Sequence, residues 1–275
     1  YVQDAKGTAG PMTVDISNGN LPLAGVTKWN TTLTSDGVNP VQLRFVGPST
    51  ITIVSQSFFV MNGFELTYLG LGSEWVSPGD GNWSEAANWG ANGVPNSTTS
   101  LALFGDSILA PSTITVDFPV TLTALNFDSA QSYTLAGAQG ITLDGTAGIS
   151  VNQGSHIIAV PLGVTGGGGL LIAGSGELTL SGGNTYTGPT TANVPTLNVT
   201  ALANGGSPSS VGASASDAAN LTFAQTLRYL GTGHTSDRLF TLSPGTPTLD
   251  ASGSGALNLN NPGQLETSGT GPRTL

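Results

Sequence analysis

The residues best suited to chemistry in this chain are its four tryptophans, its two histidines and a few aspartates that follow apolar residues. The tryptophans are Trp29, Trp75, Trp83 and Trp89. An exposed indole face can stack on the apolar C–H face of a sugar ring, so these four are the candidate carbohydrate-binding residues. The alternative for such bulky rings is a cap that closes the first rung of a repetitive fold, and this is the interpretation we favour.

The two histidines, His156 and His234, each lie in a stretch rich in glycine, serine and threonine. Either could be placed in a hydrolytic triad. The chain has no G-x-S-x-G elbow, no H-E-x-x-H, no phosphate-binding loop and no calcium-loop motif to support such chemistry. We therefore predict that both are surface or hydrogen-bonded loop residues. The prediction for the whole chain is no catalytic residue, no metal, no cofactor and no enzymatic activity.

Four aspartates each follow an apolar residue of a strand-like stretch: Asp117, Asp128, Asp144 and Asp250. Two of them aligned on neighbouring rungs, about 5 Å apart, would repel unless a proton or cation lay between them. That arrangement would suit a calcium site or the acid–base pair of a polysaccharide-cleaving enzyme. Their unequal spacing favours simple strand-ending turns. Arg228, Arg238 and Arg273 are too scattered to hold an acidic sugar.

Composition restricts the class of protein further. The 275 residues carry 6 Lys+Arg against 16 Asp+Glu, a net charge of -10, and the charged fraction of 8% is well below the ~25% usual in soluble domains. The clustered basic residues that bind phosphates are missing, so nucleic acid is excluded as a partner. The absence of cysteine removes disulfides and thiolate metal sites. No segment has the ~20 mostly apolar residues of a membrane-spanning helix.

Periodicity predicts an all-β protein. Residues 113–117, 120–123, 141–144 and 177–180 alternate apolar with polar side chains, as half-buried strands do. No helix-period window survives the 40 glycines and 16 prolines. In the amino-terminal part, residues 12–16, 41–46, 50–54 and 64–69 predict the strands of a small β-sandwich.

An internal echo indicates a solenoid, because residues 174–180 (GSGELTL) return as residues 253–259 (GSGALNL). Residues 176–191 (GELTLSGGNTYTGPTT) resemble the hallmark stretch of the autotransporter-associated β-strand repeat family of bacterial surface proteins. The resemblance covers about residues 74–275, and the tryptophan-rich start of that range resembles the entry segment that precedes such repeats. It implies a right-handed parallel β-helix that is exported and displayed outside the cell.

A weaker resemblance covers residues 1–72. Lys28 and Trp29, the stretch 41–46 and the stretch 62–69 resemble the carboxy-terminal half of a galactose-binding-like jelly-roll carbohydrate-binding module. This resemblance implies a jelly-roll-like sandwich and, within it, a sugar site.

We therefore predict three parts: a β-sandwich-like segment at 1–72, a tryptophan-rich linker or cap at 73–99, and a parallel β-helix at 100–275. The predicted function is that of an extracellular, cell-surface protein with a structural or adhesive role. Its expected partners are copies of itself or neighbouring surface proteins, with assembly into filaments or a surface layer. A carbohydrate-binding module with a polysaccharide partner is the alternative, and a polysaccharide-cleaving β-helix enzyme is the third hypothesis.

Overall fold

The computed structural model describes residues 12–18, 21–22, 29–31, 50–55 and 71–269. The chain divides into two compact units, Tyr1–Gly70 and Leu71–Leu275. The segment 73–99, which the sequence analysis set apart as a linker or cap, lies in the second unit and contributes strands to its sheets.

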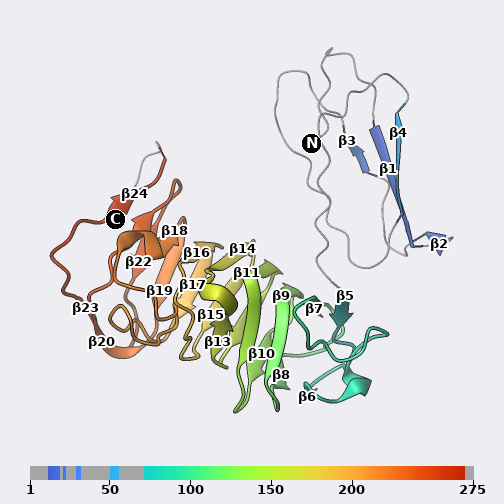
Figure 1. Ribbon diagram of the computed structural model, residues 1–275, viewed down its shortest axis with the longest axis horizontal. Coiled ribbons are helices and arrows are strands. Elements are labelled where there is room, and N and C mark those ends of the chain that lie inside the picture. Colours follow the sequence, from blue (N-terminus) through green and yellow to red (C-terminus); the bar gives the residue numbers. More distant parts are fainter. Residues whose placement is uncertain (1–11, 19–20, 23–28, 32–49, 56–70, 270–275) are drawn as a thin grey trace. The chain divides into compact units, whose positions relative to one another are not determined.

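In the first unit, four strands form one antiparallel sheet (Figure 1). β1 (Met12–Asn18) pairs with β2 (Leu21–Pro22), β3 (Trp29–Thr31) and β4 (Thr50–Ser55). The strands predicted at 12–16 and 50–54 are confirmed. The strands predicted at 41–46 and 64–69 lie outside the described residues, and so does most of the stretch that carries the jelly-roll resemblance.

The second unit is a parallel β-solenoid built from two long sheets, as the sequence predicts (Figure 1). The ten-stranded sheet contains β5 (Leu71–Glu74), β7 (Ser100–Phe104), β9 (Val120–Asp128), β11 (Ile141–Gln153), β13 (Leu162–Val164), β14 (Leu170–Gly174), β16 (Thr190–Asn193), β18 (Leu221–Phe223), β21 (Thr241–Leu242) and β24 (Glu266–Thr267). The eight-stranded sheet contains β6 (Gly81–Asn82), β8 (Ser112–Thr115), β10 (Tyr133–Ala136), β12 (Ser155–Ile158), β15 (Glu177–Leu180), β17 (Thr196–Val199), β19 (Thr226–Tyr229) and β22 (Thr248–Asp250). The right-handed sense of the coil stays a prediction.

Aliphatic residues stack from one rung to the next along each sheet. Leu178 is the register partner of Leu197, which in turn is the partner of Leu227. Ile149 and Ile172 pair in the same way in the other sheet. Because alternate residues of a strand point to opposite faces, these aliphatic side chains lie inside, and many of the intervening threonines are more exposed. Thr190, Thr196 and Asn198 are buried exceptions.

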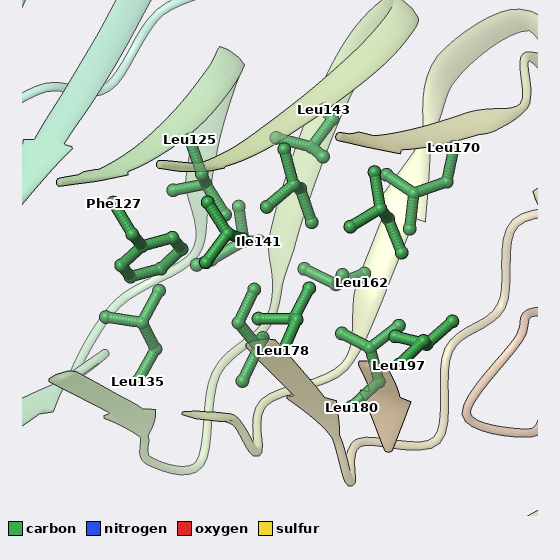
Figure 2. Close-up of a cluster of buried hydrophobic side chains, with 14 of the residues drawn as sticks. Leu125, Phe127, Leu135, Ile141, Leu143, Leu162, Leu170, Leu178, Leu180 and Leu197 are labelled. Carbon is green, nitrogen blue, oxygen red and sulfur yellow. The ribbon is translucent and has the colours of Figure 1, made fainter. Parts of the chain in front are cut away.

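Figure 2 shows how the interior is filled. Leu125, Phe127, Leu143 and Leu170 come from the ten-stranded sheet and face Leu135, Leu178, Leu180 and Leu197 from the eight-stranded sheet. Each such side chain contributes about 1.5–3 kcal/mol when it is fully buried. A core of this kind needs few surface charges, which explains how a chain with so few ionic groups forms a stable fold.

Glycine is required where the chain turns between the sheets and passes close to the previous rung. Gly174 has φ 133°, and a Cβ at this position would collide with the backbone of Val151. Gly137 has φ 140°, and a Cβ there would collide with Val116. Only glycine adopts these angles readily, so the high glycine content follows from the corners.

Helix is confined to three single turns in the described residues: η1 (Ala86–Asn88), η2 (Thr165–Gly167) and η3 (Ala218–Asn220). No helix in the described ranges is long and apolar enough to span a membrane. The two echoed segments occupy different places. Residues 174–180 include β15 of the eight-stranded sheet, whereas β23 (Gly255–Leu259) pairs with β20 (Thr232–Ser236) in a separate two-stranded sheet.

Candidate functional sites in the solenoid

Three of the four tryptophans form one buried cluster at the amino-terminal end of the solenoid. Trp75 and Trp83 are 0% exposed and Trp89 is 4% exposed. The ring of Trp89 lies 5.2 Å from that of Trp75 at 89° and 4.8 Å from that of Trp83. Phe104 of β7 contacts both Trp83 and Trp89, at 5.9 Å in each case. Edge-to-face packing of this kind adds to the stabilisation that burial itself provides.

The chain that carries these rings also covers the edge of the first strand. The amide of Val76 donates to the carbonyl of Asn88 at 2.8 Å, and the amide of Gly90 donates to the carbonyl of Glu74 at 2.8 Å. The indole Nε1 of Trp89 donates to the carbonyl of Trp83 at 2.8 Å. An antiparallel bridge between Trp75 and Trp89 completes the arrangement. The carbonyl of Glu74, at the end of β5, is therefore bonded by a returning segment of chain and is not available to another strand.

This geometry bears on the two interpretations of the tryptophans. The faces of Trp75, Trp83 and Trp89 pack on one another and on Phe104, so they present no free face on which a sugar ring could stack. The cluster has the form of the cap that the sequence analysis favoured. Trp29 lies in β3 of the first unit, and its side chain is outside what the structure describes.

A second feature is a long loop inserted into one rung. Most register partners are about twenty residues apart, but Val199 of β17 pairs with Tyr229 of β19, about thirty residues later. The extra length is the segment 200–217 between β17 and η3, hereafter the inserted loop. Ser209 in this loop forms an antiparallel bridge with Asn184 of the preceding rung. Ser207 and Pro208, at the tip of the loop, are exposed.

Arg238 is 2% exposed and anchors the inserted loop by hydrogen bonds. Its Nε donates to the carbonyl of Ala203 at 2.8 Å, Nη2 donates to that of Gly212 at 2.9 Å, and Nη1 donates to Ser214 Oγ at 3.0 Å. Burial lowers the pKa of the Arg238 guanidinium, while Tyr186 and Asp237 act in the opposite direction. An arginine stays protonated under these conditions, so its donors fix the loop through charge-assisted hydrogen bonds.

Residues of the hallmark stretch anchor the same loop from the previous rung. Asn184 Oδ1 accepts the amide of Leu162 at 2.8 Å, and its Nδ2 donates to the carbonyl of Ser210 at 2.7 Å. Tyr186 OH and Thr190 Oγ1 lie 2.8 Å apart, and burial raises the pKa of the tyrosine. The inserted loop is thus a compact element, positioned by buried polar side chains on both sides.

The carboxy-terminal end of the solenoid differs from the capped end. In the described residues, β22 has a ladder partner only in β19, and β24 only in β21. Leu259 of β23 is 44% exposed, and Leu265 beside β24 is 39% exposed. In the described residues, the last rungs therefore combine strands that have one ladder partner each with partly exposed leucines.

The histidines occupy unlike places. His156 is 0% exposed, so the prediction of a surface residue is wrong for it, although it is hydrogen-bonded as the other half of that prediction stated. Its ring lies 4.8 Å from that of Phe127 in a stacked arrangement. His234 is half-buried, and its Nδ1 lies 2.9 Å from the hydroxyl of Tyr229. Neither residue is hydrogen-bonded to a serine or an aspartate side chain as a triad would require.

The aspartates are dispersed rather than paired. Asp128 is the register partner of Gln153, and Asp250 is the partner of Arg228, so neither faces another carboxylate across the ladder. Asp117 accepts hydrogen bonds from the amide and hydroxyl of Ser84, and these lower its pKa. Asp144 accepts from Thr165 at 2.5 Å. Among the residues that the structure describes, no group of three or more acidic or histidine side chains could hold a metal ion.

Sequence reasoning missed Arg238 as an organising residue and treated it as one of several scattered arginines. The available signal was the length of chain between the strand pattern ending at Val199 and the next one beginning at Leu221. A connection of that length in a fold of short turns needs its own anchors, and Arg238 lies in the rung that follows it.

The fold and these features define an all-β, parallel β-solenoid protein with one capped end and one inserted loop. Among curated proteins, the Adhesin BmaC autotransporter of Brucella suis biovar 1 (strain 1330) is 55% identical to this chain over 71 residues. The match covers 25% of this chain and 2% of that protein. No protein-family model matches the chain, and no solved structure matches it. The relative and the solenoid agree with the predicted resemblance to autotransporter repeats in general terms.

Proposed function

We propose that this chain is part of an exported adhesive protein of the cell surface and that it acts without catalysis. The observation that carries the proposal is the 55% identity over 71 residues to a protein named an adhesin autotransporter, found in a chain that folds as a solenoid. The solenoid is the rigid structural part. Its parallel ladders use the backbone hydrogen bonds of each rung to support the next, and the aliphatic core is continuous across them.

The inserted loop is the element best suited to meet a partner. Its anchors are buried, whereas Ser207 and Pro208 at its tip are exposed. Binding residues are found disproportionately on loops that a rigid scaffold positions. A loop fixed by Arg238 also loses little conformational freedom when it binds, which favours affinity. Copies of the chain, neighbouring surface proteins and polysaccharides are the partner classes that the proposal includes.

Attachment of coated beads to cells tests the adhesive role. Beads carrying the purified chain should attach to a cultured epithelial monolayer in larger numbers than beads carrying albumin. The double variant Ser207→Ala, Pro208→Ala should reduce attachment several-fold. The matched control Thr187→Ala, Pro189→Ala alters similar exposed residues outside the loop and should not. Attachment equal to that of albumin beads would contradict the adhesive role, and equal loss in both variants would contradict the role of the loop.

Surface exposure is tested on the producing cells. A protease added to intact cells should remove the chain, whereas a cytoplasmic marker protein should survive until the cells are lysed. Protection of the chain until lysis would show that the proposed location is wrong.

Self-association is a second candidate function, because Leu259 of the two-stranded sheet β20–β23 is 44% exposed and each strand of that sheet has its ladder partner on one side in the described residues. Unpaired strand edges recruit other strands, and assembly into filaments would follow from repeated contacts of this kind.

Sedimentation over a concentration series tests this candidate. The wild type should form larger species as concentration rises, and Leu259→Lys should prevent it. Leu109→Lys is the control, since Leu109 is 82% exposed in a different loop. A wild type that stays monomeric throughout the series would exclude self-association.

A further inference from the structure

His156 connects two neighbouring strands of the eight-stranded sheet through its side chain. Its Nδ1 accepts the backbone amide of Tyr133, the first residue of β10, at 3.1 Å. Its Nε2 lies 3.0 Å from the carbonyl of Gln153. The backbone ladder between β10 and β12 begins one residue later, at Thr134 and Ile157. The imidazole therefore provides the hydrogen bond that links β10 to β12 just before their backbone ladder begins.

The partners of the ring fix its protonation state. A carbonyl oxygen only accepts, so Nε2 must carry the proton that is donated to Gln153. A backbone amide only donates, so Nδ1 must be unprotonated to accept from Tyr133. A second proton would sit on Nδ1 and point at the Tyr133 amide. The Nδ1–H group and the amide N–H would then both be donors, and no hydrogen bond could form between them. The buried amide of Tyr133 would lose its acceptor, which is costly in a water-free interior.

Among the residues that the structure describes, no acidic side chain packs against the ring to compensate a positive charge. Phe127 of β9 and Tyr133 of β10 pack against it as stacked rings, and its register partner on β15 is Leu178. Asp128, at the end of β9, is exposed, and Glu177 of β15 pairs with Ser155, so these carboxylates lie on neighbouring positions rather than against the imidazole.

The electrostatics of the site agree with this geometry. Burial lowers the pKa of His156, and the carbonyls of Gln153 and Ser129 offset part of that effect. Burial raises the pKa of the neighbouring Tyr133 phenol, so that ring is also neutral near pH 7.

We propose that His156 is an acid-sensitive latch of the solenoid. In its neutral form it joins β10 to β12 by accepting the Tyr133 amide. When protonated it releases that amide, and the rung opens locally. The proposal does not depend on the adhesive function, because it concerns a conformational response of the fold to mild acid. It gives a surface-displayed solenoid a defined position at which acid would loosen it.

The direction of the pH effect follows from linkage. A histidine whose pKa is lower in the folded state takes up its proton more readily in the open or unfolded state. Stability is then fully present above the unfolded pKa, which is about 6.5 for histidine. It falls as pH decreases from there towards the folded value. Between pH 7.5 and pH 5.5 this one group can lower the folded-to-unfolded ratio by up to about tenfold.

The amide of Tyr133 is the direct reporter of the latch. Hydrogen exchange at this amide, corrected for the intrinsic pH dependence of exchange, should show a protection factor that falls several-fold from pH 7.5 to pH 5.5 in the full chain. The variant His156→Gln keeps one acceptor and one donor without a titratable ring, and its Tyr133 protection should be independent of pH. The chain contains 2 histidines, so His234→Gln is the matched control and should behave like the wild type.

Two outcomes would overturn the proposal. One is an unchanged pH response of Tyr133 protection in His156→Gln. The other is available even if that variant does not fold: a nitrogen NMR titration of the wild-type histidines, assigned with His234→Gln. It should show neutral His156 protonated at Nε2 alone, with a pKa below the ordinary value of about 6.5. An imidazole that titrates at or above 6.5, or that carries its neutral-form proton on Nδ1, would exclude the latch.

Discussion

The first and last rungs of the described solenoid are built from the same kind of sequence but differ in how their outer strands are covered. At the amino-terminal end, three buried indoles pack together, and the segment around Asn88 and Gly90 bonds the chain at Glu74 and Val76, where β5 ends. At the carboxy-terminal end, β22 and β24 have a ladder partner on one side in the described residues, and the nearby leucines are partly exposed. A parallel ladder does not terminate itself, so closure needs aromatic volume and a returning segment of chain.

The largest expected effect is the loss of a capping ring. Trp83→Ala removes a side chain that packs on Trp89 and Phe104 and donates its Nε1 to the carbonyl of Pro95 at 3.1 Å. Truncation of a buried tryptophan costs about 3–5 kcal/mol. Urea unfolding should show this loss, and the amides of Val76 and Gly90 should exchange faster. The chain around β5 would then be as exposed to solvent as the strands at the carboxy-terminal end of the described solenoid.

Leu109→Ala is the control for the ring variant. Leu109 is 82% exposed, so its truncation should change the free energy of unfolding by no more than about 0.5 kcal/mol. If Trp83→Ala were equally mild, the cluster would not close the solenoid, and the distinction between the two ends would lose its physical basis.

The next effect concerns Arg238, whose buried guanidinium donates several hydrogen bonds to the inserted loop. Arg238→Met leaves the half-buried carbonyl of Ala203 and the buried carbonyl of Gly212 without these donors, at a cost of about 2–4 kcal/mol. Limited proteolysis should cut the inserted loop in the variant and spare it in the wild type. Arg228→Met is the control, because Arg228 is partly exposed and outside the loop. An uncut loop in Arg238→Met would contradict the anchoring role.

A smaller effect tests how tightly the cap is packed. Gly81 lies against the Asn88 amide and the Trp75 ring, so Gly81→Ala forces these groups apart at a cost of about 1–3 kcal/mol. At Gly79 a Cβ would meet nothing within 4 Å, and Gly79→Ala should be tolerated. Thermal unfolding of the two variants compares a packed position with an open one two residues away. Equal melting temperatures would show that the cap is loosely packed.

The sequence predicted the strands well, because alternation is a local property of half-buried strands. Residues 177–180 are β15 as predicted, and 120–123 and 141–144 begin β9 and β11. The parallel stacking was predicted from the echo and the family resemblance. The echoed segments do not occupy equivalent positions, since residues 174–180 belong to the eight-stranded sheet and residues 253–259 to a two-stranded sheet. The family resemblance therefore carried the prediction of parallel stacking.

The functional features were harder to predict, since they depend on which rungs meet. The tryptophans could be a platform or a cap, and the decision depends on whether the segment 88–93 folds back on β5. His156 was expected to be a surface or hydrogen-bonded loop residue, because its turn-like neighbours in the sequence give no sign that Phe127 and Tyr133 pack against it. Arg238 is buried by a loop that precedes it by more than twenty residues, a contact that no local pattern encodes.

The smallest effect compares two aspartates, one at each end, whose pKa values are lowered for different reasons. Hydrogen bonds from Ser84, in the capped end, lower the pKa of Asp117. At the open end, the Arg228 guanidinium, 2.7 Å away, lowers the pKa of Asp250, with help from Ser252. In both cases the contribution to stability is present above the unfolded pKa and is lost as pH falls through the folded value.

Salt separates the two causes. Ionic strength screens the attraction between exposed charges over a Debye length of about 10 Å at 0.1 M, but it affects a hydrogen bond from a neutral hydroxyl much less. In a carbon NMR titration, raising the salt concentration should therefore move the pKa of Asp250 towards its ordinary value and leave that of Asp117 nearly unchanged. Arg228→Gln should abolish the response of the Asp250 pKa to salt. Ser84→Ala should raise the pKa of Asp117, and that pKa should remain insensitive to salt. If both aspartates responded equally to salt, Asp117 would owe its lowered pKa to surrounding charge, and the capped end would be held by the same weak ionic contacts as the open end.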